Sequence, residues 1–389
     1  MRKKSIRIER KLCDVTDGPE NNSILASSSG RFVLSLGLIA LCSMLFALPV
    51  EGKVKGKCKD CHTIHYSYLG ADVTYGNRAG PFRILTKGGC MGCHGRNPAG
   101  AQNIIISGTT RVPQVIHRRE EGDMAAGNFY YVADGYSPHY ENGHNVEGIS
   151  LKEKPPMDVP PGFLASVAIP GGVGPIYWAG QYQLTCAGTW GCHGDRTVAD
   201  PYSAMRGAHH ADDGTVDGTS VGTSYRFLNG VSGKEHKNWE YLATTDDHNG
   251  YKGDPSHESM NTISYLCGQC HGKFHPNANL GGSEEVGHAH NAVWRRHPSD
   301  ISFSSVHGGF AGSEYQDYVS YSLDAPVANV MPTGTEKTVN EDSVIMCLSC
   351  HRAHASRYPD ILRWEYSIEA VKREGSGKGC IVCHTEKAQ

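Results

Sequence analysis

The sequence predicts a mostly irregular chain with short α-helices and minimal β-structure. The 47 Gly and 19 Pro among 389 residues are more than long helices or a wide sheet would tolerate. Nine Phe and nine Met leave few bulky apolar side chains to fill an interior. Cysteine and histidine, in contrast, recur together in one short pattern along the chain. We therefore expect something other than apolar side chains to supply much of the core.

Five segments have the form Cys-x-x-Cys-His. They are Cys58-Lys-Asp-Cys61-His62 (motif one), Cys90-Met-Gly-Cys93-His94 (motif two), Cys267-Gly-Gln-Cys270-His271 (motif four), Cys347-Leu-Ser-Cys350-His351 (motif five) and Cys380-Ile-Val-Cys383-His384 (motif six). Paired cysteines alone would fit zinc sites or disulfide bonds, but a histidine directly after each pair is the pattern of covalent c-type haem attachment. Two thiols at this spacing can add to the two vinyl groups of one porphyrin, which brings the next imidazole beneath the iron as proximal ligand.

A sixth segment, Cys186-Ala-Gly-Thr-Trp-Gly-Cys192-His193 (motif three), has five residues between its cysteines instead of two. Gly188 and Gly191 make an outward bulge sterically feasible. The final Cys-His order is kept, so we expect a proximal ligand here too, with an incidental disulfide as the alternative. The sequence thus predicts six covalent haem c groups in one domain, residues 53–389, wrapped around a chain of stacked haems.

The clearest helix is expected directly after Tyr358, with Pro359 in its first turn. Its apolar face would carry Ile361, Trp364, Ile368 and Val371 at helical spacing, and Gly375 and Gly377 would end it.

The chain holds 21 histidines, more than enough for a second, distal ligand on each iron. Motifs one and five continue as Cys-His-x-x-His, which adds His65 and His354. Such a histidine leaves on the same side of its own haem as the proximal ligand, so we expect it to bind a different haem and to bring two haems together. Further candidates lie in other segments, several of them rich in Gly or Pro: His117, His144, His209, His210 and His297, with His275 as a weaker one. Surface or supporting positions are the alternative for His117 and for the His209 and His210 pair, and spacing leaves open which histidine binds which iron.

Residues 1–52 are typical of an export signal. A basic start is followed by an apolar run from Phe32 to Val50, and small residues allow cleavage before Lys53. An uncleaved membrane anchor is the alternative, because the run is about long enough to cross a bilayer. We expect a secreted or outer-surface protein that passes through the periplasm and meets the membrane only during export.

The charge of the chain argues against a nucleic-acid partner. Residues 1–52 hold seven Lys and Arg and five acidic side chains, so the whole chain's net charge of −3 becomes −5 without them. Haem propionates would add further negative charge. Cationic, mineral or redox-protein partners fit this balance.

Several motifs resemble the OmcS-like family of six-haem cytochromes that polymerise into extracellular nanowires. The likeness lies in the number and order of the motifs and in four segments: Cys-His-Thr-Ile-His65, Gly143-His144-Asn145, Arg296-His297-Pro298 and residues 346–356 around motif five. The resemblance implies two histidine ligands on every iron and subunits joined end to end. It also implies that His65 binds the motif-five haem of the next subunit, and that His354, His144, His297 and, less closely, His117 are distal ligands within the subunit. Motif three departs from the family, and its distal ligand would have to come from His209 or His210.

The expected function is electron transfer without catalysis, in a homopolymer that carries respiratory electrons to extracellular acceptors such as metal oxides. A monomeric periplasmic carrier with the same haems is a first alternative. A reductase of a small anion is a second, but it requires an open iron position, and no motif here replaces the proximal histidine by lysine.

Overall fold

The computed structural model divides the chain into two units, Met1–Val50 and Glu51–Gln389. The described residues all belong to the second unit. They are 54, 56–62, 67–68, 71–72, 74–75, 78–79, 84–86, 88–95, 103–107, 110–117, 123–133, 139–154, 159–164, 182–209, 215–280, 297, 299–306, 308–366 and 379–385. The expected export signal, His65 and His210 lie outside them. Within these ranges, no helix is both long and apolar enough to cross a membrane.

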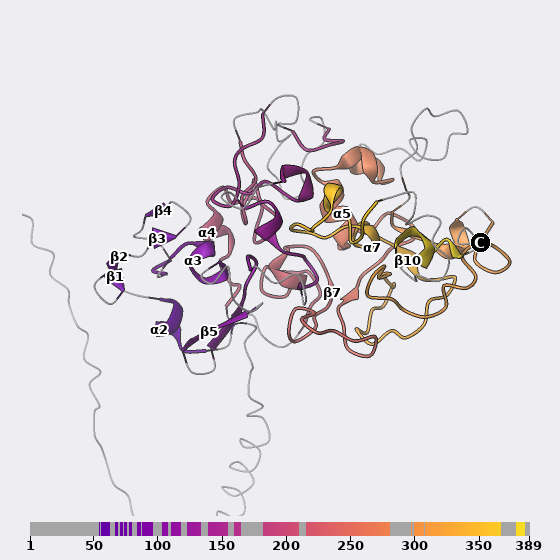
Figure 1. Cartoon of the computed structure of the whole chain (residues 1–389), viewed down its shortest axis with the longest axis horizontal. Helices are drawn as coiled ribbons and strands as arrows, with labels where there is room; N and C mark the ends of the chain where they lie inside the picture. The colour runs from indigo at the N-terminus through magenta and orange to yellow at the C-terminus, as the bar shows by residue number, and fades with distance from the viewer. Residues whose placement is uncertain are drawn as a thin grey trace, which may run out of the picture. The chain divides into compact units, whose positions relative to one another are not determined.

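The described part of the chain is mostly loops and turns, which confirms the predicted fold class (Figure 1). The α-helices are one or two turns long: α2 (Cys58–Cys61), α3 (Cys90–His94), α4 (Pro201–Ala204), α5 (Ile263–Gly268) and α7 (Cys347–Cys350). Single 3₁₀ turns cover Phe129–Tyr131, Tyr140–Asn142, Tyr225–Phe227, Gly272–Phe274, Ala278–Leu280, Phe303–Ser305, Pro359–Ile361 and Gly379–Val382.

The β-structure consists of short antiparallel pairs. They are β1 (Ser67–Tyr68) with β2 (Ala71–Asp72), β3 (Thr74–Tyr75) with β4 (Arg78–Ala79), β5 (Asn103–Ser107) with β6 (Thr110–Pro113), β7 (Gly233–Lys234) with β8 (Gly250–Tyr251), and β9 (Ile301–Ser302) with β10 (Val344–Ile345). The longest pair, β5 and β6, aligns Ile104 with Val112, and β-branched residues favour the extended backbone there. No described strand pairs with more than one other strand, so loops carry the fold.

Four of the five α-helices in the described residues coincide with cysteine motifs. Helices α2, α3 and α7 begin at the first cysteine of motifs one, two and five, and α5 contains the first cysteine of motif four. One helical turn places residues i and i+3 on the same face, so both thiols of a Cys-x-x-Cys segment point to one side. The spacing that suits attachment to one porphyrin is also the spacing of a helical turn.

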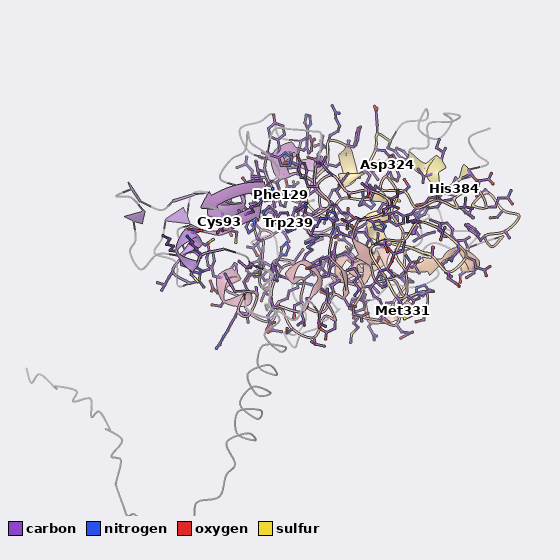
Figure 2. All side chains as sticks on the ribbon, turned by 90° about the horizontal axis from the view of Figure 1, so that it is seen from below. Cys93, Phe129, Trp239, Asp324, Met331 and His384 are labelled. Carbon is purple, nitrogen blue, oxygen red and sulfur yellow. The ribbon has the colours of Figure 1, made fainter. Side chains whose placement is uncertain are left out.

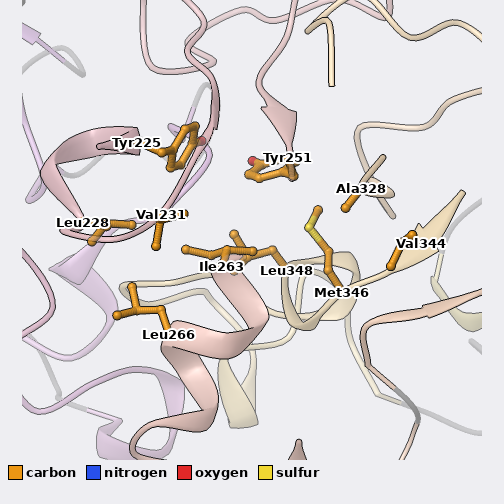
Figure 3. Close-up of a cluster of buried hydrophobic side chains, with 10 residues drawn as sticks. All are labelled: Tyr225, Leu228, Val231, Tyr251, Ile263, Leu266, Ala328, Val344, Met346 and Leu348. Carbon is orange, nitrogen blue, oxygen red and sulfur yellow. The ribbon is translucent and has the colours of Figure 1, made fainter. Parts of the chain in front are cut away.

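Apolar packing is divided among separate clusters. The cluster in Figure 3 fills the space beside α5 and α7, where Ile263, Leu266, Met346 and Leu348 meet Tyr225 and Tyr251. A second cluster surrounds Phe303, and a third surrounds Phe129 and Val132. Figure 2 labels Phe129, which is 5% exposed, and Met331, which is 84% exposed and lies at the surface.

The helix expected after Tyr358 is not formed over its first residues. Pro359–Ile361 is a tight turn in which Asp360 and Ile361 have φ values of 58° and 59°, outside the helical region. Leu362 then forms an isolated β-bridge with His351. The chain is held to motif five by this bridge, which overrides the helical spacing of the apolar residues. Residues 367–378 lie outside the described part.

Candidate functional site

In motifs one, four, five and six, the histidine closes a backbone hydrogen bond to the first cysteine of its motif. The histidine N–H donates to the cysteine C=O at 2.8 Å in motif one (His62 to Cys58), 2.9 Å in motif four (His271 to Cys267), and 3.0 Å in motifs five (His351 to Cys347) and six (His384 to Cys380). In motif two, His94 is the last residue of α3, which begins at Cys90. This shared turn fixes the direction in which each imidazole leaves the backbone.

Motif three reaches the same geometry in spite of its longer spacer. His193 N–H donates to the Cys186 carbonyl at 3.0 Å, as its counterparts do over a shorter distance in sequence. The extra residues loop outward, with Gly188 at a φ of +83° and the Trp190 ring stacked on Tyr182 at 4.0 Å. The bulge that the two glycines predicted is therefore present. None of the twelve motif cysteines, all within the described ranges, forms a disulfide bond.

The six motif histidines share a second feature, which concerns the far side of the ring. In each, Nδ1 lies within hydrogen-bond distance of an oxygen that can only accept. The partners are Ile84 O for His62 (3.0 Å), Pro113 O for His94 (3.0 Å), Arg226 O for His193 (3.0 Å), Pro161 O for His271 (2.8 Å), Asp360 O for His351 (2.7 Å) and Glu314 Oε2 for His384 (3.0 Å).

These contacts determine which ring nitrogen can bind a metal. A carbonyl or carboxylate oxygen offers no proton, so Nδ1 must carry the hydrogen and Nε2 must carry the lone pair. Metal-ligating histidines are oriented in this way by a hydrogen bond on their second nitrogen. The chain thus holds all six motif imidazoles in the tautomer whose Nε2 lone pair can bind a metal.

The accepting carbonyls come from a recurring kind of turn. The residue after the acceptor has a positive φ in four of these turns: Leu85 (57°), Gly162 (73°), Phe227 (59°) and Ile361 (59°). Left-handed backbone is costly for residues other than glycine, and such strain gathers at functional sites. The strained turn rotates the preceding carbonyl toward the imidazole, and only Pro161-Gly162 carries a turn signal visible in the sequence.

Four motif histidines face a second histidine ring. The ring centres are 5.6 Å apart for His62 and His209, 6.2 Å for His271 and His144, 6.3 Å for His193 and His354, and 6.2 Å for His384 and His297.

This separation fits one metal ion between two imidazoles. With metal–nitrogen bonds of about 2 Å, and about 1.2 Å from a ring nitrogen to its ring centre, two ligands on opposite sides of one ion have centres about 6 Å apart. Stacked rings lie closer, as the 4.0 Å stack of His248 on Tyr321 shows, although rings in edge contact reach a similar separation, as Tyr265 and His275 do at 5.9 Å. The residues present therefore fit a bis-histidine haem at motifs one, three, four and six.

The pairing differs from the expectation at motif three. His354, three residues after His351 of motif five, faces His193, while His209 faces His62. His354 can fill this position because its backbone N–H donates to Ala126 O and its ring stacks on Phe129, which carries it away from motif five. His144 and His297 face the fourth and sixth motifs.

Neither His94 nor His351 faces another histidine among the described residues. His117 lies three residues after Gln114, whose side chain donates to Cys93 O in motif two. It is fully buried beside Asn128, with Nε2 3.5 Å from Asp123 Oδ1. His65 and His210 lie outside the described part, so the partners of motifs two and five stay predictions.

The motifs follow one another in space in the order of the chain from the second to the sixth. Burial lowers the pKa of His193, and the neighbouring His94 lowers it further. Burial raises the pKa of the Cys192 thiol to about 11, with Cys270 of motif four adding to the effect. Cys267 of motif four is hydrogen-bonded to Cys347 of motif five. Burial and then Cys380 of motif six raise the pKa of Cys350 to about 12.

The paired rings sit where protonation is unfavourable. Removal from water, reinforced by His193, lowers the pKa of His354 to about 3. Removal from water, reinforced by His271, lowers the pKa of His144 to about 4. Neutral imidazole is the form that ligates a metal, so the surroundings favour ligation over protonation.

Two other buried histidines are engaged elsewhere. His275 Nε2 lies 3.1 Å from Asp300 Oδ2, and its Nδ1 accepts from Asn277 N–H at 3.1 Å. His248 places its two nitrogens 2.8 Å from Asn249 O and 3.1 Å from Glu336 O. These contacts disfavour His275 as a ligand, and its role stays a prediction. No group of three or more His, Cys, Asp or Glu in the described ranges is arranged to hold a metal ion by itself.

Comparison with known proteins adds one match to the motifs described above. Residues 337–389 match the family model named doubled CXXCH motif. This segment contains motifs five and six. No curated protein sequence matches the chain.

Two solved structures resemble the chain. One, titled Outer Membrane Cytochrome S Filament from Geobacter sulfurreducens, is 19% identical, with a TM-score of 0.40 over 84% of this chain and 87% of the other. The second, titled Cryo-EM of the OmcS nanowires from Geobacter sulfurreducens, is 18% identical, with a TM-score of 0.40 over 84% of this chain and 88% of the other.

Proposed function

We propose that the chain is an electron-transfer protein, not an enzyme, that passes electrons along six covalently bound haem c groups. The observation that carries this proposal is the orientation of the six motif histidines, each of which keeps Nδ1 on an oxygen acceptor and leaves Nε2 for iron. Twelve cysteines in matching turns supply two thioether bonds to each haem.

Both axial positions are filled by histidine in this proposal. Four facing rings are distal ligands: His209 on motif one, His354 on motif three, His144 on motif four and His297 on motif six. We assign His117 to motif two, because its segment adjoins Cys93. A substrate has no vacant position on such an iron, which disfavours the reductase alternative.

The haems supply one-electron redox chemistry, and the chain supplies rigidity. Every proximal ring is fixed by the motif turn on one side and by an oxygen acceptor on the other. Ligands held in this way stay on the metal in both oxidation states, so an electron can pass without rearrangement of the site. Motifs two to six adjoin in chain order, which supports a continuous path.

We further infer that the protein is a filament subunit at the cell exterior. The resemblance of the motifs to the nanowire family assigns His65 to the motif-five haem of the next subunit, and no described ring faces His351. Residues 1–52 would direct export through the periplasm. Extracellular metal oxides and redox proteins are the acceptors that this placement would serve, while the acidic charge gives a nucleic-acid partner no electrostatic support.

The substitution His65→Ala tests this proposal, with His139→Ala as the matched control because the His139 side chain is 64% exposed. Secreted wild type and both variants are compared by mass for six haems, by cryo-electron microscopy for filaments, and by absorption for high-spin haem. We expect His65→Ala to retain six haems, lose filaments and show about one sixth of its haem as high-spin, while His139→Ala behaves as wild type.

Two results would contradict the proposal. Discrete wild-type particles with six low-spin haems would identify a monomeric carrier, with His65 bound inside its own subunit or free. A wild-type haem that binds carbon monoxide in the reduced state would reveal an open iron position and favour the reductase.

A further inference from the structure

Motif six differs from the other five in the group that accepts the hydrogen bond from its proximal histidine. Five motif histidines donate Nδ1–H to a backbone carbonyl, whereas His384 donates to the Glu314 carboxylate at 3.0 Å. The side chains of His384 and Glu314 are 21% and 26% exposed, so the pair is only partly shielded from water.

The contact is held in place by the backbone of the same two segments. Thr385, the residue after His384, donates its N–H to Glu314 O at 2.8 Å and its hydroxyl to the same oxygen at 2.7 Å. The Tyr315 ring lies beside the imidazole, with ring centres 5.2 Å apart. Glu314 is therefore fixed on both its main chain and its side chain relative to the ligand.

A carboxylate acts on the ligand more strongly than a carbonyl. It carries a full negative charge, and hydrogen bonds to charged acceptors are shorter and about twice as strong as neutral ones. A stronger acceptor on Nδ1 increases the electron density that Nε2 gives to a metal. More electron donation and a nearby negative charge stabilise the ferric over the ferrous state, which lowers the reduction potential.

We propose that Glu314 is a positioning residue that sets the potential of the motif-six haem and makes it the lowest of the chain. The inference rests on the proposed bis-histidine haem between His384 and His297. It gives the row of haems a direction, because an electron placed at motif six moves favourably toward motif five.

The histidine pair at motif three, His193 and His354, lacks such a carboxylate acceptor on its second ring. Nδ1 of His354 is buried and has no hydrogen-bond partner in the described part of the chain, and its ring stacks on Phe129. A ligand without an acceptor donates less electron density than one bonded to a carboxylate. The motif-three haem therefore belongs at a higher potential than the motif-six haem.

The substitution Glu314→Gln tests the proposal at constant pH. It keeps a neutral oxygen acceptor of the kind found in the other motifs and removes the charge. In a spectroelectrochemical titration of the full protein, we expect one component of about a sixth of the amplitude, the lowest in wild type, to move upward. The expected change is at least tenfold in that haem's oxidised-to-reduced ratio at fixed potential, which is about 59 mV for one electron.

Glu336→Gln is the matched control, because Glu336 is also a carboxylate beside a histidine, with Oε2 3.8 Å from His248 Nε2. It should leave every component in place. Glu314→Asp, which keeps the charge, should retain a lower potential than Glu314→Gln and so separate charge from a purely structural role. The low-spin electron paramagnetic resonance signal of one haem should also change in Glu314→Gln.

The outcomes separate this inference from the proposed function. Six low-spin haems in Glu314→Gln with no component moved beyond the Glu336→Gln control would overturn the role of Glu314 and leave the cytochrome intact. A wild-type protein without six low-spin haems by mass and spectroscopy would overturn the proposed function itself. If Glu314→Gln loses the motif-six haem, Glu314→Asp decides. A Glu314→Asp titration curve in which no single component separates to lower potential than the rest overturns the inference.

Discussion

Motifs three and six each place their histidine opposite a second histidine, but in different surroundings. The His193 and His354 rings, 6.3 Å apart, lie among other imidazoles, and removal from water lowers both their pKa values. The His384 and His297 rings, 6.2 Å apart, lie where His297 is exposed and a carboxylate accepts from His384. Under the proposed function, the comparison teaches that the sequence motif supplies the proximal ligand, whereas the fold around it sets how strongly that ligand donates and how readily water reaches it.

Removing the distal ligand should distinguish the two sites most strongly. His354→Ala and His297→Ala should each convert about one sixth of the haem to high-spin, measured by absorption and electron paramagnetic resonance. His354→Ala should also destabilise the fold by about 2–5 kcal/mol, because its ring packs on Phe129 and truncation leaves a cavity. His297→Ala should cost less than about 1 kcal/mol, since an exposed side chain loses little packing.

The same two variants also test how readily a ligand from solution reaches each iron. Imidazole in solution should restore the low-spin spectrum of His297→Ala at lower concentration than that of His354→Ala. Equal rescue of both variants would show that the motif-three site is as open to solvent as the motif-six site. His275→Ala is the control, because it removes a buried histidine without changing the spin state of any haem.

The bulge in motif three, which motif six lacks, should have a smaller effect on stability. A Cβ at Gly188 would lie 2.8 Å from Val198 O in addition to the strain of its φ of +83°, whereas Gly207, at φ +86°, has nothing within 4 Å. Gly207→Ala should cost about 1 kcal/mol from backbone strain alone, and Gly188→Ala about 1–2 kcal/mol more. Denaturant unfolding gives the free energies of unfolding, and mass gives the haem count.

Haem count is the sharper readout for this bulge. Gly188→Ala should lower the fraction of chains that carry six haems, because the Cys186 carbonyl must reach His193 N–H around the loop. Gly207→Ala should leave that fraction unchanged. Identical haem counts and equal unfolding free energies for the two variants would show that the spacer adopts its shape without need of Gly188.

Much of this arrangement could be predicted from the sequence, because the motifs are local. A histidine directly after paired cysteines already predicts two thiols that reach one porphyrin with an imidazole beneath its iron, and the glycines predict the bulge in motif three. The irregular fold followed from the glycine and proline content. These features depend on residues close together in the chain, so spacing is sufficient to find them.

The remaining features depend on contacts between distant segments. Glu314 lies 70 residues before His384, and nothing in its neighbourhood in the sequence marks it as the partner of a ligand. The sequence made His209 a candidate ligand for motif three, and only the structure places it opposite His62 of motif one. The apolar spacing after Tyr358 predicted a helix. The Asp360 carbonyl instead accepts a hydrogen bond from His351, and the chain forms a tight turn there.

The strained turns offer the smallest and most specific test, because motif one contains the same element as motif three in an exposed setting. Leu85 is 51% exposed and has a φ of 57°, directly after the carbonyl of Ile84 that accepts from His62. Asparagine tolerates this conformation better than leucine. Leu85→Asn should therefore stabilise the fold by up to about 1 kcal/mol in denaturant unfolding, without any change in the haem spectrum.

Leu85→Val, which is β-branched and suits a positive φ less well, should destabilise the fold and raise the fraction of high-spin haem as the Ile84 carbonyl turns away. If both variants unfold at the wild-type denaturant concentration, the turn bears no strain, and the orientation of the His62 imidazole is set by the Cys-x-x-Cys turn alone.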